Sequence, residues 1–326
     1  MDWPRAKNIL IIAFLGVNLL LGYRLWAGPA TPNASLYRVT AREVREVTAQ
    51  LRERGVVLAA EIPRRARPLP LLTVSNPQPD PAALAARFLG AGAKVVAQGE
   101  VWVGRKGQEA VVIYPGGEVF YRRLPASSAG AAPGSLAPAG AAAGSPAATG
   151  GGEPDATRAV QLAREFWAQR GGLPAGGELD YRTPVGGGRY LVVFTCKTAG
   201  HRFFGSRAMA LVGPHGVEEA YAAWPVPEKP SGSARPILPA TEALVRAVPF
   251  LVKKGAVVVQ VEAGFYSPVY DAREWEAVPV WRVRLGSGTV LYVNAYTGEL
   301  EGLDQPYPRQ GQEMFGPLQK QTSQAR

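Results

Sequence analysis

The chain is poor in the residues that form disulfides and bind metals. One cysteine, Cys196, in 326 residues excludes an internal disulfide. Two histidines, His201 and His215, together with that cysteine cannot supply a zinc site rich in histidine or thiolate. Cys196 lies in the apolar stretch YLVVFTC, which indicates a buried and unreactive thiol. The sequence therefore predicts neither a metal site nor a bound cofactor.

The sequence patterns of common catalytic and nucleotide-binding sites are also missing. There is no HExxH, GxSxG, GxGxxG or P-loop match. Glu218 and Glu219 are adjacent, and on a strand they would point to opposite faces, which disfavours a catalytic pair. A Cys196–His201 dyad, or a secreted hydrolase that uses His201 or Glu219, is the alternative. We expect no catalytic residues and a protein that is not an enzyme.

Acidic residues are outnumbered, with 26 Asp and Glu against 36 Lys and Arg and a net charge of +10. The basic residues are scattered, and no recognition motif accompanies them, so nucleic acid is not an expected partner. Arginine, alanine, glycine and proline are abundant, which a GC-rich genome explains. The other explanation for the excess of basic residues is a protein surface that binds anionic lipid or wall polymer.

Charge is absent from residues 9–23, where Asn18 is the one strongly polar residue. Counted from Ala6, the apolar run has roughly 18 residues, which is enough to span a bilayer core. Basic residues precede the run and few follow it closely, so the N-terminus is expected in the cytoplasm and the bulk outside. Residues 1–30 are therefore predicted to be a cytoplasmic tip and a transmembrane helix in the cell membrane. The predicted interface anchors are Trp3, Arg5, Lys7, Tyr23, Arg24 and Trp26.

Asn18 distinguishes this helix from a plain anchor. An amide in hydrocarbon favours a hydrogen-bonding partner, and small residues let helices approach closely. Gly22 follows Asn18 by one turn, and Ala13 and Gly16 form a second small-residue patch. These four residues predict a helix–helix contact. A cleavable export signal is the alternative, with small residues at 27–30, although bulky residues at 23–26 disfavour cleavage.

The rest of the chain alternates one helix with several strands. Helices are expected to begin at Thr40, Asp80 and Asp155 or Thr157, and a fourth after Pro239 contains Pro249. This order predicts an α+β class in which antiparallel sheet domains are each packed with a helix. Residues 88–100 and 250–262 have several identical residues at the same spacing, which either an internal duplication or chance explains. The predicted regions are a first extracytoplasmic domain at 31–124, a low-complexity linker at 125–154, a second region at 155–303 divisible into 155–230 and 235–303, and a flexible tail at 304–326.

The two ends of the chain resemble the YycH/YycI family. The opening MDWPRAKNILIIAFLGVNLLL is similar to the start of YycI-type proteins, and residues 264–302 are similar to the family's C-terminal signature. Similar hairpins occur in PepSY-type domains, so the resemblance implies PepSY-like helix-plus-meander units. In this hairpin we expect Trp281 and Tyr292 to pair across neighbouring strands. Asn294 is expected to bond the backbone of a tight turn at Thr297–Gly298.

The resemblance implies regulation and no catalysis. Members of the family are bitopic proteins outside the Gram-positive membrane. They associate, largely through transmembrane helices, with the sensor histidine kinase of the essential cell-wall two-component system and with a YycH-type partner. The alternative function is an exported PepSY-like ligand-binding or inhibitor module without a kinase partner.

Overall fold

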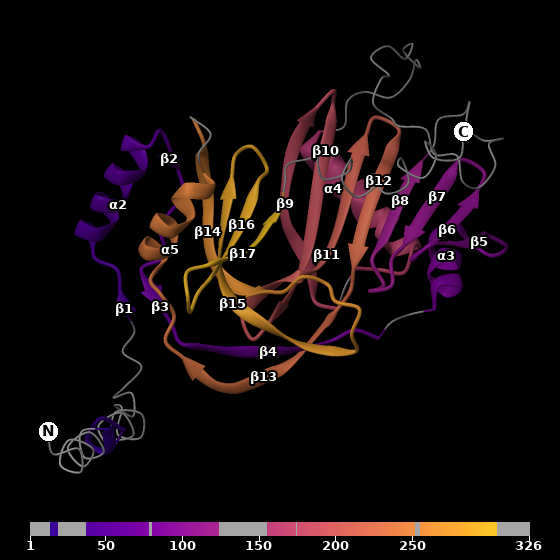
Figure 1. The fold of residues 1–326 in the computed structure, drawn as a ribbon. Helices are drawn as coiled ribbons and strands as arrows, with labels where there is room; N and C mark the ends of the chain where they lie inside the picture. Colours follow the sequence, from indigo (N-terminus) through magenta and orange to yellow (C-terminus); the bar gives the residue numbers. More distant parts are fainter. Residues whose placement is uncertain are drawn as a thin grey trace, which may run out of the picture.

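The fold is mostly β-sheet with a few helices, as a computed structural model of the chain shows (Figure 1). The structure describes residues 14–18, 37–77, 80–123, 155–173, 175–251 and 255–304. The helices are α2 (Ala41–Glu53), α3 (Pro81–Leu89), α4 (Ala156–Gln169), α5 (Ala240–Ala247) and the 3-10 turn η2 (Val248–Phe250).

The strands before the predicted linker are β1 (Tyr37–Arg38), β2 (Val57–Leu58), β3 (Arg65–Ala66), β4 (Leu69–Ser75), β5 (Lys94–Gln98), β6 (Val101–Lys106), β7 (Glu109–Ile113) and β8 (Val119–Arg123). Those after it are β9 (Gly177–Gly186), β10 (Arg189–Thr198), β11 (His201–Gly213), β12 (Gly216–Ala223), β13 (Val226–Arg235), β14 (Val257–Tyr266), β15 (Glu274–Leu285), β16 (Val290–Asn294) and β17 (Leu300–Asp304).

Local sequence signals place the helix starts. Thr40 and Glu43 form the predicted capping box, in which the Glu43 amide donates to the Thr40 hydroxyl and the Thr40 amide donates to the Glu43 carboxylate. Asp80 and Asp155 cap α3 and α4 through side-chain oxygens. The last helix is shorter than expected, since α5 ends at Ala247 and Pro249 lies in a 3-10 turn. Proline lacks the amide hydrogen that continues an α-helix.

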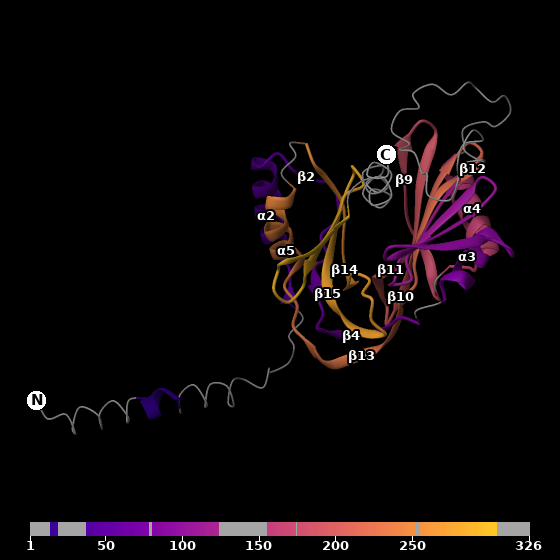
Figure 2. The ribbon, with the colours of Figure 1, turned by 45° about the vertical axis from the view of Figure 1, so that its right-hand side comes forward.

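Fifteen strands pair into one continuous sheet that bends into two parts (Figures 1 and 2). The first part runs β5–β6–β7–β8–β12–β11–β10–β9 and carries α3 and α4 on its outer face. The second contains β14–β17 with α2 and α5 on its outer face. A short parallel pairing of β11 with β14, at Arg202↔Gly264 and Phe203↔Phe265, joins the parts. β4 and β13, with the beginning of β15, form a ribbon across the base.

Strands from both sides of residues 125–154 therefore belong to the same sheet. β8 pairs with β12, β4 pairs with β13 and β15, and α2 packs against α5. The sequence led us to expect a separate sheet in each domain. Alternation of apolar and polar residues predicts which face of a strand is buried, but it does not specify the strand's partner.

Two details of the strands differ from the expectation. Residues 94–104 are mostly apolar and would be predicted as one strand from the sequence, but they divide at Gly99 into β5 and β6, and Gly99 has a φ of 61°. β13 was not expected, because Pro227, Pro230 and Gly232 interrupt it. Proline cannot donate to a strand ladder, so such a segment is tolerated as the edge strand that β13 forms.

Two hydrophobic cores lie beneath the helices. Trp167, Phe88 and Tyr121 are fully buried in the core between α3, α4 and the first part of the sheet. Trp281, Leu51 and Leu244 occupy the corresponding core beneath α2 and α5. Burial of such side chains stabilises each part by about 1.5–3 kcal/mol per large residue. The inner faces of the two parts are left to form the site described below.

The part of the chain that the structure describes contains no helix long and apolar enough to cross a bilayer. Most of the predicted anchor lies outside the described residues, as do residues 124–154 and 305–326. The predicted site residues outside the described part are Trp3, Arg5, Lys7, Ala13, Gly22, Tyr23, Arg24 and Trp26.

Candidate functional site

A helical turn at residues 14–18 holds two of the predicted contact residues, Gly16 and Asn18. Phe14, Leu15 and Val17 on this turn are 69%, 55% and 54% exposed. The Asn18 side-chain amide donates to the Phe14 carbonyl at 2.9 Å. Apart from its chain neighbours and its own helical backbone, no atom of the described residues lies within 4 Å of where a Cβ on Gly16 would stand. The turn therefore presents apolar side chains and one amide outward.

The C-terminal hairpin has the predicted turn. Gly298 adopts a φ of 77°, and the Asn294 side-chain oxygen (Oδ1) accepts from the backbone amides of Tyr296 and Thr297 at 2.8 and 3.0 Å. The Asn294 amide donates to Glu301 at 2.6 Å. Asn294 thus ties β16 to the turn and to β17, which confirms the roles expected for Asn294, Thr297 and Gly298.

The expected pairing of Trp281 with Tyr292 was wrong. Trp281 lies opposite Val293, and Tyr292 lies opposite Arg282. Trp281 and its partner Val293 share one face of the sheet, and Tyr292, which is next to Val293, points to the opposite face. Trp281 therefore packs in the core beneath α5, while Tyr292 faces the inner side. The Trp281 indole donates to the Leu238 carbonyl at 2.8 Å. The register differs by one residue from the one assumed, and such a shift moves a side chain to the other face.

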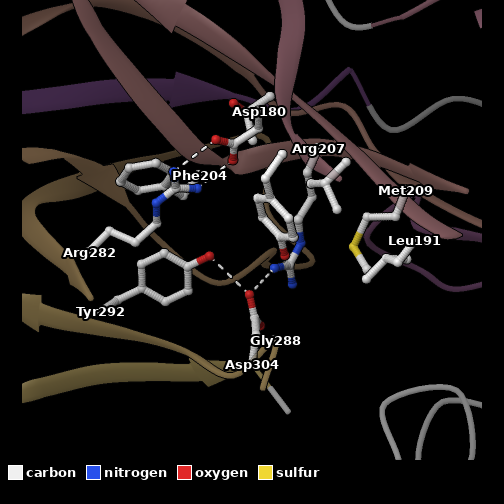
Figure 3. A pocket seen from close by; sticks show the side chains of 12 residues that line it. Asp180, Leu191, Phe204, Arg207, Met209, Arg282, Gly288, Tyr292 and Asp304 are labelled. Carbon is white, nitrogen blue, oxygen red and sulfur yellow. Dashed lines mark hydrogen bonds and ion pairs between the residues drawn. The ribbon is translucent and has the colours of Figure 1, made fainter. Parts of the chain in front are cut away.

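The inner faces of the sheet enclose a group of charged residues that we call the arginine cluster (Figure 3). Its members are Asp180, Arg202, Arg207, Glu262, Arg282 and Asp304. The Arg282 guanidinium donates to both oxygens of Asp180 and also to Glu262. The side chains of Arg282 and Asp180 are each 1% exposed. Such forked pairing fixes both partners in one geometry.

The arginine cluster joins the two parts of the sheet. Asp180 on β9 pairs with Arg282 on β15, and Arg207 on β11 pairs with Asp304 on β17. The Tyr292 hydroxyl donates to Asp304 at 2.9 Å, as Figure 3 shows. The Arg282 guanidinium also lies 4.4 Å from the ring centre of Phe204 on β11. The Tyr292–Asp304 bond lies within the second part, but the other three contacts cross from one inner face to the other, so the cluster holds the bend closed.

The electrostatics of the cluster suit a fixed structural contact. Burial lowers the pKa of Arg282, but the hydrogen bonds and charge of Asp180 and the charge of Glu262 outweigh it, and the net pKa is raised. Burial, with the charges of Asp304 and Asp180, raises the pKa of Tyr181 to about 12. The open space among these side chains is about 10 Å³, the lower limit for one water molecule. The cluster therefore has no room for an organic substrate.

The residues considered for catalysis do not converge. Cys196 lies opposite Phe203, whereas His201 lies opposite Thr198. Cys196 is buried as expected, and burial raises the pKa of its thiol to about 11. Glu219 is paired with Arg122 at 2.8 Å. Among the described residues, no group of three or more His, Cys, Asp and Glu side chains is placed to hold a metal ion.

A separate pocket of about 250 Å³ lies where α3, the loop after α4 and the start of β13 meet. Leu84, Leu173 and Trp224 supply apolar walls. Arg87 is held at the wall, because it donates to the Gly171 carbonyl at 2.6 Å and stands 5.6 Å from the Trp224 ring centre. The sequence did not indicate this pocket or the arginine cluster, since the contributing residues come from distant segments without a local motif.

Comparisons with known proteins assign no family. No family model matches the chain, and no curated protein matches it. Thirteen chains among solved structures match. An uncharacterized protein from Eubacterium rectale is 11% identical, with a TM-score of 0.43, over 77% of this chain and 91% of that one. The Bacillus megaterium YpeB C-terminal domain is 12% identical, with a TM-score of 0.32, over 68% and 94%. At these scores the two likenesses assign neither a fold family nor a function.

Proposed function

We propose that the chain is a membrane-anchored extracytoplasmic regulator of a two-component sensor histidine kinase, of the YycI type. Its N-terminal helix contacts the kinase and a YycH-type partner within the bilayer, and the sheet-rich part stands outside the membrane. Regulation of cell-wall homeostasis is the role that the sequence resemblance implies. Two lines support the proposal: that resemblance, and the outward-facing turn at residues 14–18.

The observation that carries the proposal is the exposure of Phe14, Leu15 and Val17 on one helical turn. Large apolar side chains on neighbouring positions are costly in water and suit lipid or a partner helix. The turn lies inside the apolar run that, counted from Ala6, has roughly 18 residues, which is enough to span a bilayer core. A membrane environment accounts for both features.

Asn18 supports contact with a second helix. Its amide gives one hydrogen to the Phe14 carbonyl, and no other described residue bonds to the second hydrogen or the side-chain oxygen, so these are left for a partner helix. In hydrocarbon these groups gain most from a polar atom on a neighbouring helix. Gly16 adds no side chain, so a partner backbone can approach closely at that position.

The test replaces residues 9–23 with an unrelated apolar helix and measures co-purification of the sensor kinase from membranes. We expect loss of the kinase with the replacement and a partial loss with Asn18→Leu. Val17→Leu, which keeps the segment apolar, is the matched control and should retain the kinase. Unchanged co-purification of the replaced chain would exclude the helix as the contact.

The pocket beside Arg87 favours a second candidate, an exported PepSY-like module that binds a small ligand. Apolar walls with one positioned cation are typical of small-molecule sites. Under this alternative the N-terminal segment serves only for export. Mass spectrometry of the mature chain separates the two, because a start near Ala30 supports the module and a retained residue 1 supports the anchor.

A further inference from the structure

Four exposed arginines lie within or next to the two short strands where the described fold begins. β1 and β3 form a two-stranded sheet in which Arg38 lies directly opposite Arg65. Arg64 and Arg67 lie directly before and after β3 and are also exposed. We call Arg38, Arg64, Arg65 and Arg67 the entry patch. Like charges directly opposite each other destabilise a strand pair, so Arg38 and Arg65 indicate a missing counter-charge.

The described part of the chain does not supply that counter-charge. None of the four arginines forms an ion pair or side-chain hydrogen bond with another described residue. Glu43 receives hydrogen bonds from Tyr37 and Thr40, and Glu242 pairs with Arg246. Residues 19–36, which lead into β1, contain no Asp or Glu and add Arg24. An anion from outside the described part of the chain is therefore the partner that the patch fits.

We propose that the entry patch binds anionic phospholipid headgroups at the membrane surface. Phosphate groups match the forked donors of arginine, and each basic residue near an anionic bilayer adds a favourable contribution. The position of the entry patch in the chain favours lipid over another polyanion as its ligand. Tyr37 follows the uncharged segment 9–23 after 13 residues, which extend to at most about 45 Å, so the patch stays within reach of the surface.

The test uses the full chain in nanodiscs of phosphatidylcholine, with or without phosphatidylglycerol. A fluorophore is attached to Ala41→Cys, beside β1 at the start of α2, and quenched by nitroxide lipids labelled in the headgroup. The native Cys196 is buried, so we expect it to react too slowly to take up the label. We expect phosphatidylglycerol to increase quenching at position 41, and high salt to reverse the increase because it screens surface charges. A label on Ser287→Cys, in the turn between β15 and β16, should stay unquenched.

Paired variants assign the effect to the patch. Arg38→Gln with Arg65→Gln should lower the ratio of docked to undocked states about 25-fold, at roughly fivefold per arginine. Arg52→Gln with Arg54→Gln removes the same charge from exposed positions at the far end of α2, about 20 Å away. This control pair should retain the phosphatidylglycerol effect.

Three results would overturn the proposal: equal quenching in both lipids, equal losses in the two paired variants, or binding of soluble poly(glycerol phosphate) without a lipid effect. Failure of the anchor is recognised separately, because a chain cleaved after the apolar segment is absent from the nanodiscs and its mass is reduced. The released chain should still float with phosphatidylglycerol vesicles at low salt if the patch binds lipid.

Discussion

Arg282 and Asp180 form a forked ion pair between β15 and β9, and each side chain is 1% exposed. The pair crosses the bend at which β11 and β14 share two residue pairs of parallel ladder. Because so little backbone pairing joins the two parts at this bend, we expect the side-chain contacts of the arginine cluster to help hold the two parts together. Its contribution can be measured by removing one partner at a time.

Asp180→Asn should lower the free energy of unfolding by about 3–5 kcal/mol, because the buried Arg282 guanidinium loses its forked, charged partner and keeps only Glu262. Replacing both partners, as Asp180→Leu with Arg282→Met, should cost less than either single change. Urea unfolding measures both. Glu242→Gln, which breaks the exposed pair with Arg246, is the control and should cost less than about 1 kcal/mol. A double variant less stable than both singles would contradict the role assigned to the pair.

Asn294→Ala should destabilise the C-terminal hairpin by about 1–3 kcal/mol, since the Tyr296 and Thr297 amides lose their acceptor. Amide hydrogen exchange would locate the loss at residues 294–301. Ser287→Ala, in the exposed turn before β16, should change stability by less than about 0.5 kcal/mol. Equal effects of the two substitutions would show that Asn294 does not organise the turn.

Cys196 should react slowly with thiol reagents in the folded protein. Burial raises its pKa to about 11, so at neutral pH the thiolate fraction is about 100-fold below that of a free thiol. Labelling with iodoacetamide in increasing urea should accelerate together with the loss of fluorescence from the buried tryptophans. Fast labelling without denaturant would show that the β10–β11 hairpin opens in the native state.

Glu218 should make stability decrease between acidic and neutral pH. Burial raises its pKa in the folded state, so this contribution is present below the unfolded value of about 4.3 and lost as pH rises through the folded value. Glu218→Gln should therefore stabilise the protein relative to wild type, by more at pH 7 than at pH 4. Thermal unfolding across this range measures the difference. A gain that is the same at every pH would exclude titration of Glu218 as its cause.

Features that depend on a few neighbouring residues followed from the sequence. The caps at Thr40, Asp80 and Asp155 and the turn at Asn294–Gly298 need contacts within five residues, and the structure has all of them. Most strand segments also followed, because the alternation of apolar and polar residues reports burial, but β13 did not.

Features that depend on long-range pairing could not be predicted. Asp180 and Arg282 are 102 positions apart, and neither carries a motif that points to the other. The Trp281–Tyr292 expectation failed for the same reason, since register is set by packing across strands. The pocket beside Arg87 also needs segments that meet only in the folded chain.

The central proposal is that residues 9–23 contact a sensor kinase inside the membrane. The most direct test is cross-linking in native membranes from single cysteines placed in turn along 9–23, with trapped partners identified by mass spectrometry. The account predicts that a sensor histidine kinase is trapped from Asn18 and from positions three or four residues away, with weak trapping between them. Trapping without helical spacing, or no kinase at any position, would contradict it.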